Sequence, residues 1–211
     1  MRQSAIEFEV DGEAVKGIMA GPVKPAGKIP AVVVCHPHPL FGGTMDSPVV
    51  YAICHHLAES GIASLRFNFR RPGDGSPAVG DGAARDVATA FWVIQQWDHV
   101  NSKKCGAAGY SFGAAAILKS LDYLDAARAL ALVAPPINAL KGSSIASDKR
   151  ARQVIAGESD KLVRIDELKS TLAAMSRPPE IVGIPGADHF LAGHEGRVGD
   201  LVAQFMVRAL R

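Results

Sequence analysis

Hydrophobic and polar residues alternate at the start of the chain, whereas further on the hydrophobic residues run together in short blocks. Residues 5–10 and 14–20 form two extended segments joined by Asp11 and Gly12, a dipeptide that suits a tight hairpin turn. From residue 30 onward, short all-apolar segments alternate with helical ones, as expected for a parallel sheet covered by helices. The pattern predicts six such strands, at residues 31–35, 63–69, 106–110, 129–134, 153–156 and 180–184.

The segments between these strands have helical spacing. One predicted helix is capped by Ser47, has Pro48 in its first turn and ends before Gly61. Apolar residues three and four apart predict three buried stripes, which are Val49, Val50, Ile53 and Leu57; Val87, Ala90, Phe91, Ile94 and Trp97; and Leu201, Val202, Phe205 and Ala209. The order of elements predicts an α/β fold with a mostly parallel central sheet, an N-terminal antiparallel hairpin and helices on both faces.

Length and composition narrow the class of protein. With 211 residues, 48% of them hydrophobic, the chain suits one domain spanning residues 1–211. The 23 basic and 21 acidic residues are scattered, so we expect neither nucleic acid nor a membrane surface as a partner. Glu7 and Glu9 interrupt the apolar run that a secretory signal would need, and no apolar run elsewhere reaches the ~20 residues of a membrane span. The three cysteines, Cys35, Cys54 and Cys105, suit a reducing compartment. We therefore expect a cytoplasmic protein.

Residues 109–113 read GYSFG, a G-x-S-x-G pentapeptide between a predicted strand and an alanine-rich helical segment at residues 113–121. In a nucleophile elbow, the serine occupies a strained strand-to-helix turn, and flanking glycines let the neighbouring backbone approach. Ser111 is therefore the candidate nucleophile. The alternative is a glycine-rich strand end with a serine that caps the helix, because a short motif of this kind also arises by chance.

This arrangement requires an acid and then a histidine later in the chain, each after a strand. Asp160 follows the strand at 153–156 and is the candidate acid, with Glu158 and Asp166 as rivals; its alternative role is to cap the next helix. His189 follows the strand at 180–184 and is the candidate base. The remaining histidines fit less well, since His55 and His56 lie within a predicted helix, His99 at the end of one, and His194 in a glycine-rich tail.

The loop at residues 36–45, HPHPLFGGTM, follows the first parallel strand, where this fold places one donor of the oxyanion hole. Pro37 and Pro39 have no N–H, which leaves the His38 amide, or Leu40 as the alternate, to join the Phe112 amide. A rival interpretation treats the imidazoles of His36 and His38 as metal ligands. No third ligand is evident in the sequence, so we expect no metal and no cofactor.

Four motifs together, namely HPHPLFGGTM at 36–45, LRFNFR at 65–70, GYSFG at 109–113 and GADHF at 186–190, resemble a bacterial family of small, uncharacterised α/β-hydrolases related to dienelactone hydrolases. The resemblance spans roughly residues 5–210 and implies Ser111, Asp160 and His189 as a triad that hydrolyses carboxylic esters. The chain departs from the family in the loop 71–77, RPGDGSP, which is expected to border the pocket, and from dienelactone hydrolases in having serine, not cysteine, at the elbow.

Residues 135–152 leave no room for a cap domain before the strand at 153–156. We therefore expect an open, shallow cleft walled by the loops 36–45, 71–82 and 136–150, with the stretch 141–150 as a solvated loop. The expected function is a carboxylesterase-like serine hydrolase acting on small esters or thioesters. The alternatives are a peptidase or amidase with the same triad, and a non-catalytic ligand-binding protein of the same fold. Whether the chain forms a homodimer is left open.

Overall fold

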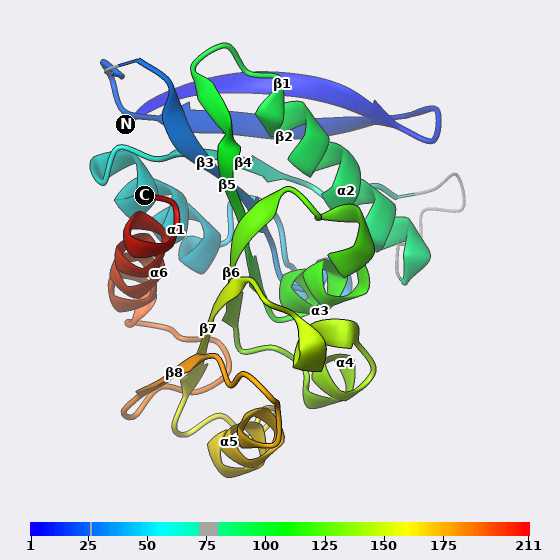
Figure 1. Cartoon of the computed structure of the whole chain (residues 1–211), viewed down its shortest axis with the longest axis vertical. Helices are drawn as coiled ribbons and strands as arrows, with labels where there is room; N and C mark the ends of the chain where they lie inside the picture. The colour runs from blue at the N-terminus through cyan, green and yellow to red at the C-terminus, as the bar shows by residue number, and fades with distance from the viewer. Residues whose placement is uncertain (26, 72–79) are drawn as a thin grey trace.

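The computed structural model describes residues 1–25, 27–71 and 80–211, and within them a twisted sheet runs in the order β1-β2-β4-β3-β5-β6-β7-β8 (Figure 1). β1 pairs antiparallel with β2, and β2 antiparallel with β4, while the strands from β4 to β8 are parallel. The bounds of the strands are β1 Arg2–Val10, β2 Glu13–Gly21, β3 Ile29–Cys35, β4 Ala63–Phe67, β5 Val100–Tyr110, β6 Ala127–Val133, β7 Ala151–Gly157 and β8 Glu180–Ile184.

Helices cover both faces of this sheet. α1 and α6 pack together on one face, and α2, α3, α4 and α5 lie on the other (Figure 1). Three short 3₁₀ helices, η1 Pro39–Phe41, η2 Leu121–Tyr123 and η3 Ser144–Ser147, lie in the connections. The α-helices are α1 Pro48–Glu59, α2 Asp81–Gln95, α3 Phe112–Lys119, α4 Ile137–Lys141, α5 Ile165–Ala173 and α6 Glu195–Ala209.

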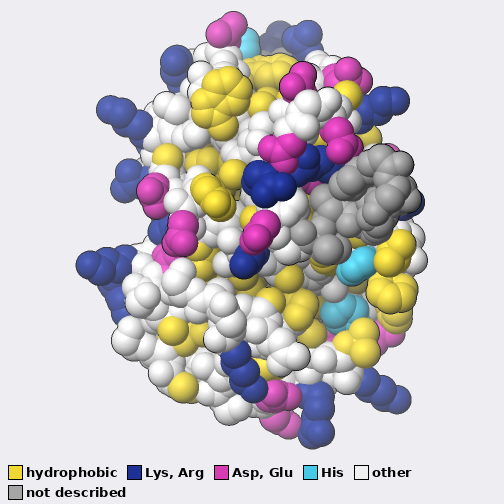
Figure 2. All heavy atoms as spheres, turned by 90° about the vertical axis from the view of Figure 1, so that its right-hand side faces the viewer, with side chains coloured by type: hydrophobic (Ala, Val, Ile, Leu, Met, Phe, Trp, Pro, Cys, Tyr) yellow, Lys and Arg dark blue, Asp and Glu magenta, His cyan; other side chains and the backbone are white. Residues whose placement is uncertain are grey.

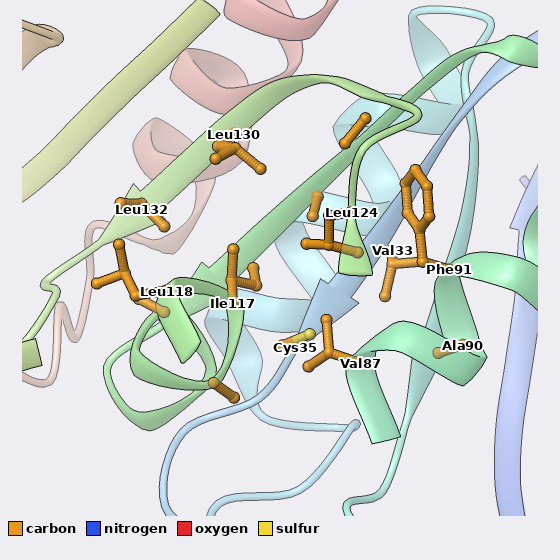
Figure 3. Packing of buried hydrophobic residues seen from close by; sticks show 14 of the residues in the cluster. Val33, Cys35, Val87, Ala90, Phe91, Ile117, Leu118, Leu124, Leu130 and Leu132 are labelled. Carbon is orange, nitrogen blue, oxygen red and sulfur yellow. The ribbon is translucent and has the colours of Figure 1, made fainter. Parts of the chain in front are cut away.

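The central strand β3 is apolar at every position, because both of its faces are covered by helices. In β3, Val33 and Cys35 face the cluster under α2 and α3, and Val32 and Val34 face the cluster under α1 and α6. Figure 3 shows the first cluster, in which side chains of α2 and α3 meet those of β3 and β6. The buried sheet therefore holds the carboxyl ends of β3, β5, β7 and β8 in place, and the loops that follow these strands lie at the same edge of the sheet.

The predicted hairpin, the helix-covered parallel sheet and the single-sided helical stripes are confirmed. Asp11 and Gly12 form the hairpin turn with φ of 50° and 83°, the left-handed region that this turn type requires at both positions. In the described residues the connection from β6 to β7 holds only α4 and η3, so no cap domain stands there.

Several local predictions were wrong in detail. The strand expected at 63–69 ends at Phe67, and the one expected at 106–110 begins at Val100, ahead of a register irregularity. Trp97 lies beyond the end of α2. The Ser47 hydroxyl accepts from the Thr44 amide and caps no amide of α1.

The stretch 141–150 is not a plain solvated loop, because η3 buries Ile145 there. The loop proposed to wall the cleft at 71–82, including its departure from the family pattern at 71–77, falls mostly on residues 72–79, outside the described residues. None of the helices in the described ranges has the length and hydropathy needed to cross a membrane.

Candidate active site

Ser111 lies on the sharp turn between β5 and α3, with φ of 53° and ψ of −111°. This backbone conformation is costly for a residue with a side chain, and it projects the hydroxyl above the sheet edge. A Cβ on Gly113 would lie 2.3 Å from the Cys35 carbonyl oxygen, and one on Gly109 would lie 2.6 Å from backbone atoms of Gly113. Glycine is therefore required on both sides of Ser111, as the sequence motif predicted.

Asp160 lies in the turn after β7 and is 4% exposed. Its Oδ2 is 2.7 Å from His189 Nδ1, and its Oδ1 accepts from the amides of Leu162 and Val163, at 2.8 Å each. The rival carboxylates Glu158 and Asp166 are exposed. The capping alternative fails because Asp160 binds amides of its own turn, whereas α5 begins only at Ile165.

His189 lies in the loop after β8 and joins the two other side chains. Its Nε2 is 3.0 Å from Ser111 Oγ, and its Nδ1 faces Asp160. Because the Asp160 carboxylate can only accept a hydrogen bond, the proton of the neutral ring is on Nδ1, and Nε2 is left to accept from the Ser111 hydroxyl. Ser111, His189 and Asp160, which were selected from the sequence, thus form one hydrogen-bonded chain at the sheet edge.

Tyr110 fixes the position of the histidine loop, a role that the sequence did not reveal. Its buried hydroxyl donates to the His189 carbonyl oxygen at 2.7 Å. Burial raises the pKa of Tyr110 to about 12, so this donor keeps its proton over the ordinary pH range. A Cβ on Gly157 would lie 2.2 Å from the Ala187 carbonyl oxygen, so the acid loop and the histidine loop also pack closely.

Both ends of the loop 36–45 are bound to the residues that follow β4. His36 is 1% exposed, and its Nε2 accepts from the Phe69 amide at 3.1 Å while its Nδ1 donates to the Pro37 carbonyl at 2.6 Å. At the other end, the Met45 amide donates to Asn68 Oδ1 at 2.8 Å. The HPHP and RFNFR motifs therefore form one structural unit, a connection that neither motif indicates alone.

The environment of His36 excludes it as a metal ligand. Both nitrogens of its ring are already in hydrogen bonds, Nδ1 to the Pro37 carbonyl and Nε2 to the Phe69 amide, so neither is free to bind an ion. Within residues 1–25, 27–71 and 80–211, no three His, Cys, Asp or Glu side chains cluster as a metal site would require.

His38 lies in the loop after β3, against Phe112, the residue that follows Ser111. Its Nδ1 accepts from the Leu40 amide at 3.2 Å, and its ring packs against the rings of Phe112 and Phe41, with centroids 4.7 and 5.3 Å away. The Leu40 amide is thus already engaged. Among the described residues, no acceptor binds the His38 amide.

A buried ion pair between Arg70 and Asp86 holds the segment after β4 against α2. Arg70 Nε lies 2.6 Å from Oδ1 of the fully buried Asp86 of α2, and the Arg70 amide donates to Oδ2 of the same carboxylate. The Arg70 guanidinium also binds Asp11 in the hairpin turn at 2.7 Å. Arg70, the last residue of the RFNFR motif, therefore links the N-terminal hairpin and α2 to Asn68 and Phe69, which bind the loop 36–45.

The other histidines lie apart from this chain of groups. His55 and His56 face Glu59 on α1, His99 lies in the turn before β5, and His194 stands at the amino end of α6 and not in a tail. A hollow of about 490 Å³ opens at the opposite, amino-terminal edge of the parallel strands, where Ile29 and Val100 line it. It takes no part in the site at Ser111.

Comparison with known proteins places this geometry in context. No model of a known protein family matches the chain. An uncharacterised protein of Rickettsia prowazekii is 29% identical over 171 residues, which cover 76% of this chain and 71% of that protein.

Among solved structures, an α/β serine hydrolase homologue from Coxiella burnetii is 28% identical, with a TM-score of 0.81 over 95% of this chain and 96% of that one. A dienelactone hydrolase from Anabaena variabilis is similar in fold, with a TM-score of 0.80 at 20% identity over 100% and 99% of the two chains. The chain therefore has the α/β-hydrolase fold, and its likeness to the serine hydrolase homologue supports a hydrolase.

Proposed function

We propose that the chain is a serine hydrolase that cleaves small carboxylic esters or thioesters through an acyl-enzyme on Ser111. The observation that carries the proposal is the chain of contacts from Ser111 Oγ to His189 Nε2, at 3.0 Å, and from His189 Nδ1 to the buried carboxylate of Asp160, at 2.7 Å. These distances lie within the hydrogen-bond reach that a nucleophile and its base need.

In the proposed reaction, Ser111 Oγ attacks the carbonyl carbon while His189 Nε2 takes the hydroxyl proton. His189 then gives this proton to the departing alcohol or thiol, which leaves the acyl group on Ser111. Water, deprotonated by His189, then attacks the acyl-enzyme, and His189 returns the proton to Ser111 Oγ as the acid is released. Asp160 holds the Nδ1 proton and stabilises the imidazolium that forms at each step.

The oxyanion of each tetrahedral intermediate is assigned to the amides of Phe112 and His38. Phe112 begins α3, so its N–H points out of the helix toward the site, where the helix dipole also favours negative charge. The His38 amide is favoured over that of Leu40, because the Leu40 amide already donates to the His38 ring. Each such donor contributes about 10²–10³-fold to kcat in comparable sites.

Free thiols at Cys35, Cys54 and Cys105, all of them buried, fit a reducing compartment, and we place the protein in the cytoplasm on this ground.

The test is labelling with a fluorophosphonate probe, followed by mass spectrometry of the modified peptide and by assays with p-nitrophenyl acetate, p-nitrophenyl butyrate and aminoacyl amides. We expect the probe on Ser111, hydrolysis of the esters in preference to the amides, and loss of both labelling and hydrolysis in Ser111→Ala. Ser120→Ala is the matched control, since its hydroxyl is buried in α3's C-cap and donates only to the Ile117 carbonyl.

Equal labelling of wild type and Ser111→Ala would overturn the proposal, and it would favour a ligand-binding protein of the same fold. A dominant amidase activity that depends on Ser111 would overturn the assignment of esters while leaving the nucleophile in place.

A further inference from the structure

Large apolar side chains project into solvent from the loops that carry the site. Leu40 and Phe41, beside His38, are 65% and 87% exposed, and Phe190, beside His189, is 69% exposed. Figure 2 shows hydrophobic side chains gathered next to histidine side chains on one face of the molecule. Covering such side chains with an apolar group of a ligand is favourable, because it removes apolar surface from water. We refer to Leu40, Phe41 and Phe190 as the apolar rim.

The strand order places the two parts of this rim on opposite sides of Ser111. Ser111 follows β5, the loop with Leu40 and Phe41 follows the neighbouring β3, and the loop with Phe190 follows β8 on the other side of β5. The ring of Phe41 lies 5.3 Å from that of His38, and the ring of Phe190 lies 6.1 Å from that of His189. The rim therefore lies beside His38 on one side of Ser111 and beside His189 on the other.

In the proposed reaction, the acyl chain and the leaving group of the substrate lie on different sides of Ser111. The leaving group must lie against His189 Nε2 to receive its proton, and this is the side of Phe190. In the proposed reaction we assign the acyl chain to the side away from the leaving group, which is the side of β3, where Leu40 and Phe41 lie. We infer, on the basis of the proposed function, that the apolar rim selects esters with apolar groups on both sides of the scissile bond, with Leu40 and Phe41 taking the acyl chain and Phe190 the alcohol.

The acyl side is tested by measuring kcat/KM for p-nitrophenyl acetate, butyrate and hexanoate. Full burial of one methylene raises kcat/KM about fourfold, and a rim that covers only one side of the chain raises it about twofold per methylene. Hexanoate has about four more methylenes than acetate, so its kcat/KM should be roughly 15-fold higher in the wild type. In Phe41→Ala this preference should fall to roughly fourfold. Intrinsic reactivity cancels, because each variant is compared with the wild type on the same substrate.

The alcohol side is tested with benzyl acetate and methyl acetate. Phe190→Ala should lower kcat/KM for benzyl acetate about fivefold more than for methyl acetate, since an aromatic contact is lost only with the benzyl ester. Trp92→Ala is the matched control, because Trp92 is an aromatic residue, 61% exposed, on α2 and away from the site loops. It should leave both preferences unchanged.

Two results would overturn the inference without touching the proposed function. One is Ser111-dependent hydrolysis in which Phe41→Ala keeps the wild-type chain-length preference and Phe190→Ala keeps the wild-type preference for benzyl acetate over methyl acetate. The other is a dimer, measured by light scattering, that Phe41→Ala dissociates, because the rim would then be covered by a second copy. Absence of both ester hydrolysis and probe labelling at Ser111 would instead overturn the proposed function, and the inference with it.

Discussion

The buried imidazole of His36 makes stability depend on pH in a way that a single substitution isolates. Its pKa falls from the ordinary 6.5 to about 4 in the folded state, chiefly because burial disfavours the charged ring. The unfolded chain therefore binds a proton between these values that the folded chain does not. The stability that the neutral ring provides is fully present above about pH 6.5 and is lost as the pH falls toward 4.

The size of this effect follows from the shift. One pKa unit corresponds to about 1.4 kcal/mol, so the displacement from 6.5 to about 4 corresponds to a loss of about 3 kcal/mol over the whole interval. Asp86 acts in the opposite direction, because burial raises its pKa from 3.8 to about 6 and its protonation favours the folded state below that pH. The wild-type curve alone can therefore look flat, and the comparison with a variant is needed.

The experiment measures the free energy of unfolding by urea titration at steps from about pH 7 to about pH 4.5, in wild type and in His36→Gln. Glutamine keeps an acceptor for the Phe69 amide and does not titrate, so the destabilisation relative to wild type should shrink by about 2 kcal/mol as the pH falls. His55→Gln, with a side chain 43% exposed on α1, is the control and should run parallel to wild type. Parallel curves for His36→Gln and wild type would refute the reasoning, as would an NMR titration of His36 near 6.5.

Three further substitutions test how the site is positioned. Asp160→Asn should fold but lower kcat on the order of 10⁴-fold, because the amide no longer stabilises the His189 imidazolium or fixes its tautomer; steady-state kinetics and a folded circular-dichroism spectrum check this. Tyr110→Phe removes the 2.7 Å bond to the His189 carbonyl and should lower kcat about tenfold at a stability cost of about 1 kcal/mol, whereas unchanged kcat would show that the loop is held without it. Gly113→Ala places a Cβ 2.3 Å from a β3 carbonyl oxygen and should lower stability by about 3 kcal/mol or prevent folding, while Gly196→Ala, with no atom within 4 Å, should not.

Local patterns in the sequence were sufficient to predict the strands, the longer helices and the three candidate site residues, but not α4, which lies in the stretch 136–150 that was expected to be a loop. Strand periodicity and the order of Ser111, Asp160 and His189 along the chain are one-dimensional signals, and parallel strands bring the loops at their carboxyl ends together whatever the exact register. Strand ends were predicted less well. β4 stops at Phe67 because the amides of Phe69 and Arg70 bind His36 and Asp86, partners that no local window contains.

The contacts that hold the site in place were not predictable for the same reason. The Met45 amide meets Asn68, and the Tyr110 hydroxyl meets the His189 backbone, across 23 and 79 positions of the chain. Such pairs depend on how the strands are ordered in the sheet, which the alternation of strands and helices leaves undetermined. The sequence motifs contain Met45, Asn68, Tyr110 and His189, but only the structure shows which of them bind one another.

The most direct test of the central claim is to trap the covalent intermediate. Protein mixed with p-nitrophenyl acetate, quenched in acid during turnover and digested, should yield an acetyl group on the peptide that contains Ser111, and none in Ser111→Ala. Turnover of the ester with Ser111 unmodified, or with the acetyl group on another residue, would contradict the account.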